Sequence, residues 1–424
     1  MRFDEMVAAL ALEESADILR PGWEESARSL PEDEIAFLTE PFLRQAVVPF
    51  ATHPDGVRAA IAMGRRIAGD AALRALAWHY HCVIYGPAPA AWDRIHKWPS
   101  LKQALGEEAG LFNAVVFLSG VPKMHEIHGA RQIPQDVIDT TLGDVSIGLW
   151  RARGDSHIGI LPDDVGWYAS FTRGELYRLG RLQFQFGWFA PHFRAYRHRE
   201  TRSLLALAEA GGQFRADGQL SLTEDEPGHW HARLEVTETG ITGCPILPEG
   251  RAVYRPVTLS AAEWELLASS RDRALAVHIP GDGPGGERLD IDACGDSFRR
   301  ALEFFPGHYP NFSFVGFCCE SWLLNSWLEQ VLPPSSNIVR FQREVYLLPG
   351  ELDRHETVDA AFGGCLPEDL SQAPRETSFQ RAILAMLDKG DAVPFTAGKC
   401  FLLSEDVIRW GTQCYRTQAL PIVA

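Results

Sequence analysis

Residues 273–348 constrain the fold more than any other part of this 424-residue sequence. The pattern predicts strand, glycine-rich turn, helix, strand, helix and strand, over residues 274–279, 280–286, 296–305, 312–319, 322–331 and 338–348. A strand, a helix and a second strand of these lengths form a parallel crossover unit, which is right-handed in nearly all proteins. The two parallel strands therefore end at the same edge of the sheet, where α/β proteins bind ligands.

Chemically reactive side chains stand at the ends of both strands. His278 ends the first, and it is either a core histidine bonded to a backbone carbonyl or a general base that also positions a bound carbonyl. Glu320 and Ser321 end the second, and both are candidate catalytic residues. The glutamate could act as a base or bind an amine, and the alternative role of the serine is to cap the next helix. Cys319 is either packed in the core or a nucleophile activated by His278.

Composition and charge narrow the class of protein. The chain has 40 Lys+Arg against 56 Asp+Glu, a formal charge of −16, which argues against general binding to nucleic acids or anionic membranes. The N-terminus reads as an amphipathic helix rather than a signal peptide, and no apolar run reaches the ~20 residues of a membrane span. The eight scattered cysteines indicate reduced thiols, so a cytoplasmic protein is expected.

Common cofactor and nucleophile motifs are missing from the sequence. The histidine pairs 79/81 and 125/128 lack the spacing of known metal-binding motifs, and no set of cysteines and histidines completes them, so no metal is expected. Neither a GxxxxGK[ST] phosphate loop nor a GxSxG elbow occurs, which argues against the common nucleotide and serine hydrolases.

The hydrophobic period changes along the chain. Apolar residues recur at helical spacing over residues 1–150, which predicts a helical domain, whereas residues 179–186 alternate as a strand does. The sequence predicts an α+β protein, with a mixed-sheet domain over residues 151–364 and a helical extension over residues 365–424. Short helices are expected at residues 260–267 and 377–387.

Four segments carry a resemblance to a known family: residues 177–184 (YRLGRLQF), 277–280 (VHIP), 319–324 (CESWLL) and 336–338 (SNI). They resemble the bacterial two-domain acyltransferases that join an N-acyltransferase N-terminal domain to a C-terminal domain like the GCN5-related N-acetyltransferases (GNAT). The resemblance spans about residues 3–390. It implies transfer of an acyl group, expected to be a fatty acyl group, from a pantetheine thioester to an amine. The acceptor is expected to be a peptide, such as the lysine or ornithine side chain of a ribosomally made peptide, or a small molecule.

The resemblance also implies roles for individual residues. Backbone between Val277 and Ile279 would hold the thioester carbonyl, and Asn325 would contact the leaving thiol. Phe314 and Phe317 would line an apolar acyl tunnel between the two parallel strands. The glycine-rich loop, through Gly281, Gly283, Gly285, Gly286 and Arg288, would bind the donor's diphosphate.

That loop departs from the family pattern. Members usually have Gln/Arg-x-x-Gly-x-Gly/Ala after the first strand, whose N–H groups bind pyrophosphate. Here the loop carries acidic residues, with Asp290 and Asp292 following, and carboxylates repel a diphosphate. Acyl-CoA and an acyl carrier protein are therefore both expected as donors.

A cluster of basic residues lies on a predicted hairpin, through Arg194, Arg197 and Arg199. It is either a solvated surface or a dock for coenzyme phosphates, an acidic carrier protein or an acidic peptide. Two other activities stay open: a Cys319-based thioesterase or condensing enzyme with a covalent acyl intermediate, and a non-catalytic scaffold that binds acyl thioesters.

Overall fold

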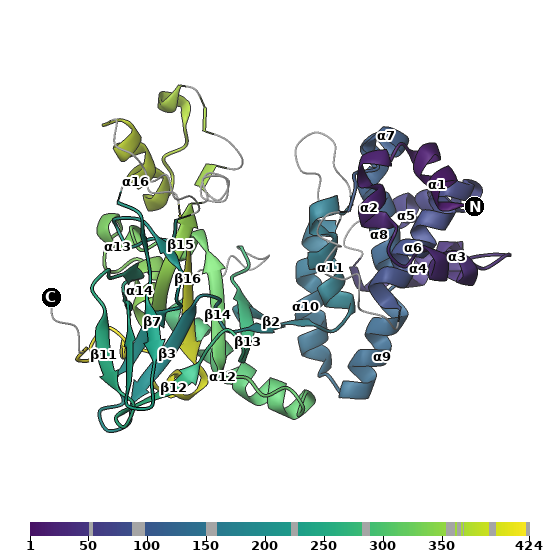
Figure 1. Ribbon diagram of the computed structural model, residues 1–424. Coiled ribbons are helices and arrows are strands. Elements are labelled where there is room, and N and C mark those ends of the chain that lie inside the picture. The colour runs from purple at the N-terminus through teal and green to yellow at the C-terminus, as the bar shows by residue number, and fades with distance from the viewer. Residues whose placement is uncertain are drawn as a thin grey trace. The chain divides into compact units, whose positions relative to one another are not determined.

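The computed structural model describes residues 1–50, 54–86, 98–149, 159–221, 228–281, 289–352, 361–362, 366–367, 369–389 and 396–420. Contacts within the chain divide it into two units, Met1–Leu179 and Gly180–Ala424. The first unit is helical and the second is built on β-sheets (Figure 1), as the α+β prediction requires. Each unit is described by itself.

The first unit packs its helices around one apolar core. Its elements are α1 (Phe3–Leu10), α2 (Ala16–Leu19), α3 (Trp23–Ser29), α4 (Glu40–Val47), α5 (Pro54–Gly69), α6 (Ala71–Tyr85), α7 (Lys102–Leu105), α8 (Ala109–Leu118), α9 (Val121–Arg131), α10 (Gln135–Leu149), α11 (Val165–Thr172) and the short strand β1 (Leu176–Leu179). Helix α8 is apolar on all sides and is correspondingly buried at the centre. The helical unit extends past residue 150 because α11 packs on α8 and α10.

One helical stretch is long and apolar enough to cross a membrane by composition alone. It runs over Lys102–Arg131, and 67% of its most apolar window is buried inside the protein. Burial in the helical core accounts for its apolar composition, because a central helix needs apolar residues on every face.

The described residues of the second unit form two larger sheets and two small ones. Its strands are β2 (Leu182–Trp188), β3 (Phe193–His198), β4 (Leu204–Ala208), β5 (Gln213–Phe214), β6 (Trp230–His231), β7 (Leu234–Val236), β8 (Gly240–Gly243), β9 (Pro245–Leu247), β10 (Arg251–Ala252), β11 (Val257–Ser260), β12 (Trp264–Ala268), β13 (Arg273–His278), β14 (Gly316–Ser321), β15 (Tyr346–Leu352) and β16 (Thr396–Leu403). Within this unit the main sheet runs β2-β13-β14-β16-β15, and a second sheet runs β10-β9-β4-β3-β12. Its helices are α12 (Ile291–His308), α13 (Leu328–Val331), α14 (Asn337–Glu344) and α16 (Ser378–Leu387).

The crossover unit expected from the sequence is confirmed. Strand β13 leads through α12 to β14, and the two strands are parallel neighbours. Helix α12 covers one face of the sheet, where the Phe298 ring lies 5.8 Å from Phe184 of β2 and 4.9 Å from Phe317 of β14. Helix α16 also forms where expected, with Thr377 and Gln380 making a capping box at its start.

Several elements differ from the sequence prediction. Residues 260–267 form a turn and strand β12 rather than a helix, because Trp264 and Leu266 pair with β3. Residues 338–344 belong to α14, and the third strand begins only at Tyr346. The helix expected at 322–331 is a 3₁₀ turn (Trp322–Leu324) and the single turn α13.

The largest difference lies in the C-terminal part, which was expected to be a helical extension. Its strand β16 instead occupies the main sheet between β14 and β15 (Figure 1). Strand β14 is thereby paired on both sides, with parallel β13 and antiparallel β16. The sheet is incomplete without the last strand of the chain.

Candidate active site

The two parallel strands at the centre of the main sheet part before they end. Their ladder contains two residue pairs in the described structure, Leu275 with Phe317 and Ala276 with Cys318. Strand β13 continues to His278 along β2, and β14 continues to Ser321 along β16. Beyond the ladder, the facing edges of β13 and β14 carry backbone groups that can pair with an extended ligand placed between them.

Side chains alternate along these strands, so each residue can be assigned to one of two faces. The register places Val277, Phe317 and Cys319 on the face under α12 and α14, here called the helix-covered face. It places Cys318 and Glu320 on the opposite face, together with His278, and this is called the His278 face. The register with β16 places Lys399 opposite Glu320 and therefore on the His278 face as well.

His278 is held at the end of β13 by a side chain of β2. Its Nε2 lies 3.0 Å from Oε1 of Gln185, and a carboxamide oxygen accepts hydrogen bonds, so Nε2 carries the proton. Burial lowers the pKa of His278 to about 4. The ring is therefore neutral at physiological pH, which is the state that a proton acceptor requires.

Glu320 and Ser321 differ in their surroundings at the end of β14. The Glu320 side chain is 55% exposed, and its Oε1 lies 3.4 Å from Nζ of Lys399. The Ser321 hydroxyl accepts a hydrogen bond from the Leu323 N–H at 3.3 Å and so caps the following 3₁₀ turn. Glu320 remains a candidate for binding or deprotonating an amine, and Ser321 has a structural role as a cap.

Two models of protein families match adjacent parts of the chain. The N-acyltransferase N-terminal domain matches residues 41–174, and the GNAT-like C-terminal domain matches residues 176–400, which is more than half of the chain. The chain belongs to this family of acyltransferases. The resemblance drawn from the four sequence segments is thereby confirmed.

Solved acyltransferase structures share the fold over nearly the whole length. A structure in complex with decanoyl-CoA and teicoplanin is 22% identical, with a TM-score of 0.61, over 95% of this chain and 99% of that one. A mutant acyltransferase in complex with octanoyl-CoA is 21% identical, with a TM-score of 0.62 and the same coverage. A search of curated proteins finds no match to the chain.

The acyltransferase does not place Cys319 beside His278. The Cys319 side chain is on the helix-covered face, opposite Cys400 of β16, and both cysteines are buried. Burial and the neighbouring Cys319 thiol raise the pKa of Cys400 well above its usual value. The sequence left open that His278 activates Cys319, and the strand register does not favour it, because the two side chains point to opposite faces of the sheet.

The acyl tunnel expected between the strands is closed in the described structure. The space on the helix-covered face amounts to about 10 Å³, which is hardly room for one water molecule. Phe317 lines this void with Phe298 and Phe341, whereas Phe314 packs among the rings of Phe305 and Phe312. An acyl chain can enter at this point only if the aromatic side chains move.

The donor-binding residues inferred from the resemblance fall into three groups. Gly281 is exposed at the start of the loop, whereas Gly283, Gly285, Gly286 and Arg288 lie outside the described residues. Val277 and Ile279 flank His278 at the point where the strands part. Asn325 is 4% exposed and its Oδ1 accepts the Trp327 N–H at 3.0 Å, so its placement indicates a structural role.

The backbone N–H groups at the start of α12 already donate hydrogen bonds to a carboxylate of the same chain. Oδ1 of Asp290 accepts hydrogen bonds from the N–H groups of Asp292 and Ala293, both at 3.0 Å. These are the first-turn donors that bind pyrophosphate in related folds. A diphosphate bound there would have to displace this carboxylate.

The predicted basic dock consists of paired arginines. Arg197 is 1% exposed and pairs with the buried Asp406, so the prediction that it contacts a donor or partner is wrong. Arg194 pairs with Glu209 at 2.7 Å, and Arg199 pairs with Glu265 at 2.6 Å. Arg194 lies on β3 and Arg199 directly follows that strand. Their acidic partners offset the positive charge on which the predicted dock depended.

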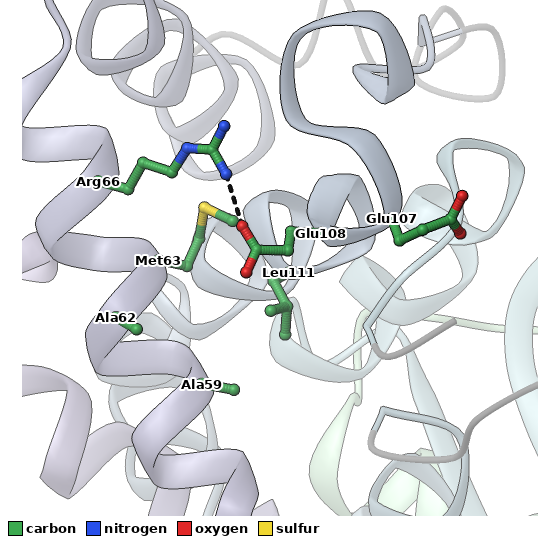
Figure 2. Close-up of a pocket in the computed structure, with 7 residues that line it drawn as sticks. All are labelled: Ala59, Ala62, Met63, Arg66, Glu107, Glu108 and Leu111. Atoms are coloured by element: carbon green, nitrogen blue, oxygen red, sulfur yellow. Dashed lines mark hydrogen bonds and ion pairs between the residues drawn. The ribbon is translucent and has the colours of Figure 1, made fainter. Parts of the chain in front are cut away.

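A separate hollow of about 550 Å³ lies in the helical unit (Figure 2). Apolar side chains of α5 and α8, including Met63 and Leu111, form its floor. An ion pair between Arg66 and Glu108, with 2.5 Å between Nη1 and Oε2, lies at its edge. Among the described residues that line it there is neither a nucleophile nor a histidine, so these residues offer no candidate for the chemistry. In the part of the chain that the structure describes, no group of three potential metal ligands occurs.

Sequence reasoning missed Gln185, Lys399 and Glu351 near this site. In the sequence, Gln185 is one residue of an alternating strand and has no distinguishing mark. Its contact with His278 depends on the register of β2. The other two lie on strands whose pairing was not recognised. A single sequence contains no local signal that β16 enters the sheet beside β14.

Proposed function

We propose that this acyltransferase moves an acyl group from the thioester of acyl-CoA to an amine of a peptide or small molecule. The observation that carries the proposal is the gap between β13 and β14, with a neutral His278 at one side and the exposed Glu320 at the other. Membership of the acyltransferase family supports the reaction class.

The reaction proceeds by direct attack. The pantetheine arm lies between the two strands, and backbone N–H groups from Val277 to Ile279 hold the thioester oxygen and the oxyanion that forms from it. The neutral amine nitrogen attacks the carbonyl carbon, its proton passes to the neutral imidazole of His278, and the carbon–sulfur bond breaks. The thiolate of CoA leaves and takes up a proton, which gives the amide and free CoA.

A medium-length fatty acyl donor is the form of this proposal that we favour. Solved structures of the same fold contain octanoyl-CoA and decanoyl-CoA. The closed void beside Phe317 requires that the acyl chain displaces side chains as it enters. The Asp290 cap on α12 implies that the diphosphate contributes little there, so octanoyl-CoA and an octanoyl carrier protein should be compared directly.

The test measures free thiol and amide product together. The purified protein is given acyl-CoA donors from acetyl to dodecanoyl, with acceptors that include lysine and ornithine peptides, teicoplanin and small alkylamines. We expect one amide formed per CoA released, with kcat/KM highest near eight to ten carbons, the lengths in the related complexes. Absence of amide with every amine would overturn the proposed function, and a maximum at acetyl would overturn the fatty donor.

A further inference from the structure

A bulge in β15 brings a third charged side chain to the His278 face. The register with β16 shifts between two pairs, Leu348 opposite Lys399 and Glu351 opposite Ala397. Three steps along β15 therefore match two steps along β16. In a regular ladder the alternation would turn Glu351 to the other face, whereas the extra residue turns it to the face of Lys399.

The bulge is fixed by backbone contacts of Gly350. Its N–H donates to Oε1 of Gln219 at 2.9 Å, and its carbonyl oxygen accepts the Leu220 N–H at 3.1 Å. A Cβ atom at this position would collide with the carbonyl oxygen of Ala397. The orientation of Glu351 is therefore built into the fold rather than chosen by a flexible side chain.

The result is a cluster of three charges, here called the Glu-Lys-Glu cluster: Glu320, Lys399 and Glu351. Nζ of Lys399 lies 3.0 Å from Oε1 of Glu351 and 3.4 Å from Oε1 of Glu320. The Lys399 side chain is only 11% exposed, while the side chain of Glu351 is 39% exposed and that of Glu320 is 55% exposed. One ammonium balances one of two carboxylates, which leaves one negative charge directed at solvent beside the end of β14.

This arrangement differs from an ion pair that only stabilises the fold. In the Arg197–Asp406 pair both side chains are 2% exposed, so neither can meet a ligand. In the Glu-Lys-Glu cluster the positive charge is buried and the negative charges are accessible. An incoming ammonium ion finds a preorganised anionic site, and Glu320 shares the His278 face with the proposed base.

We propose that the Glu-Lys-Glu cluster is the subsite for the acceptor's ammonium group, in which Glu320 contacts the amine and Lys399 and Glu351 position it. The proposal rests on the proposed function, because it names the part of that site that selects positively charged amines. Lys399 keeps Glu320 in one orientation, and Glu351 holds Lys399 so that it does not neutralise Glu320 completely.

Substitutions of Glu351 and Lys399, which form one ion pair, should then change the KM for a charged acceptor in opposite directions. Glu351→Gln lets Lys399 pair fully with Glu320, so we expect the KM for a lysine peptide to rise about tenfold. Lys399→Met leaves two carboxylates that bind the acceptor ammonium in place of the lysine. We expect a lower KM together with a kcat reduced about tenfold, because the amine is held protonated and displaced. Lys399→Arg should behave nearly as the wild type does.

The assay uses octanoyl-CoA with two acceptors, a lysine peptide and aniline, which is uncharged at neutral pH. The changes in KM and kcat should occur only with the lysine peptide, and the KM for octanoyl-CoA should not change. Glu329→Gln is the matched control, since it removes a carboxylate 2.8 Å from Arg343 in the same unit but away from the His278 face. Thermal unfolding reports whether each variant is folded; if Lys399→Met is not, Glu351→Gln and Lys399→Arg carry the test.

The outcomes separate this inference from the proposed function. If the wild type forms no amide with any amine, the proposed function fails and the subsite fails with it. If the wild type is active but Glu351→Gln leaves the lysine-peptide KM unchanged, or shifts both acceptors equally, the subsite is overturned while the acyl transfer stands. A KM that rises in both Glu351→Gln and Lys399→Met would also overturn it, since loss of structure alone produces that result.

Discussion

The two faces of the β13–β14 pair are built from alternate residues of the same strands, yet they differ in every property that matters for chemistry. The helix-covered face, with Val277, Phe317 and Cys319, is apolar and leaves a void of about 10 Å³. The His278 face carries a neutral imidazole and the exposed carboxylate of Glu320. Residues adjacent in sequence, such as Cys319 and Glu320, therefore belong to different faces of the sheet with different chemical environments.

The strongest test of this comparison removes the proposed base. We expect His278→Ala to lower kcat by about 10²- to 10⁴-fold, the usual contribution of a general base. Steady-state release of CoA measures the effect. His198→Ala is the control, because His198 lies on β3 of the second sheet and packs against Trp264. Equal losses in both variants would mean that the His278 face has no special role.

The helix-covered face should respond in stability rather than in chemistry. Phe317 is 1% exposed and its ring lies 4.9 Å from Phe298, so Phe317→Ala should lower the free energy of unfolding by about 3–5 kcal/mol. Denaturant titration measures this loss. With acetyl-CoA, whose acyl group is too short to fill the void beside Phe317, the rate per folded molecule should stay within about threefold of the wild type. A large loss of kcat in fully folded protein would show that this face takes part in catalysis.

The lowered pKa of His278 makes stability depend on pH. The folded state takes up this proton only near pH 4, whereas the unfolded chain does so near 6.5, the ordinary pKa of histidine. The unfolded state therefore binds more protons as the pH falls, and stability is lost between about pH 6.5 and 4. Relative to His278→Gln, the wild type should lose up to about 3 kcal/mol across this range. If the free energy of unfolding changes with pH equally in the wild type and in His278→Gln, the imidazole is not buried and neutral in the folded protein.

A smaller effect is expected from the side chain that orients the imidazole. Gln185→Leu removes the acceptor 3.0 Å from Nε2 and so releases the ring from one tautomer. We expect kcat to fall about tenfold while the KM of both substrates stays near that of the wild type. Gln185→Glu retains an acceptor and should preserve more activity than Gln185→Leu. If both substitutions are silent, the bond to Gln185 does not set the tautomer.

Local sequence patterns predicted the crossover unit and the position of His278. The alternating run at β13 and the long amphipathic stretch at α12 each carry their own periodicity, and the right-handed crossover rule then places both strand ends together. The helical first unit and α16, with its Thr377 cap, were predictable for the same reason. The resemblance to the acyltransferase family came from short segments around these same elements.

Elements whose identity depends on distant partners were not predictable. Residues 339–342 alternate apolar and polar side chains as a strand does, but they form part of α14, where Gln342 donates to the Leu323 and Asn325 carbonyl oxygens. Strand β16 is recognisable only from its pairing with β14 and β15. The bulge that orients Glu351 is a property of that pairing, so the Glu-Lys-Glu cluster has no signature in the sequence.

The central claim is direct transfer from donor to amine on the His278 face, with no acyl group carried by Cys319. Intact-mass measurement on the wild type, Cys319→Ala and His278→Ala, each with octanoyl-CoA with and without a lysine peptide, tests it most directly. Direct transfer predicts no octanoyl adduct on any of the three proteins. It also predicts that the wild type and Cys319→Ala form amide at rates within about twofold of each other. An octanoyl adduct on the wild type that Cys319→Ala lacks, with amide formation lost in the same variant, would contradict it.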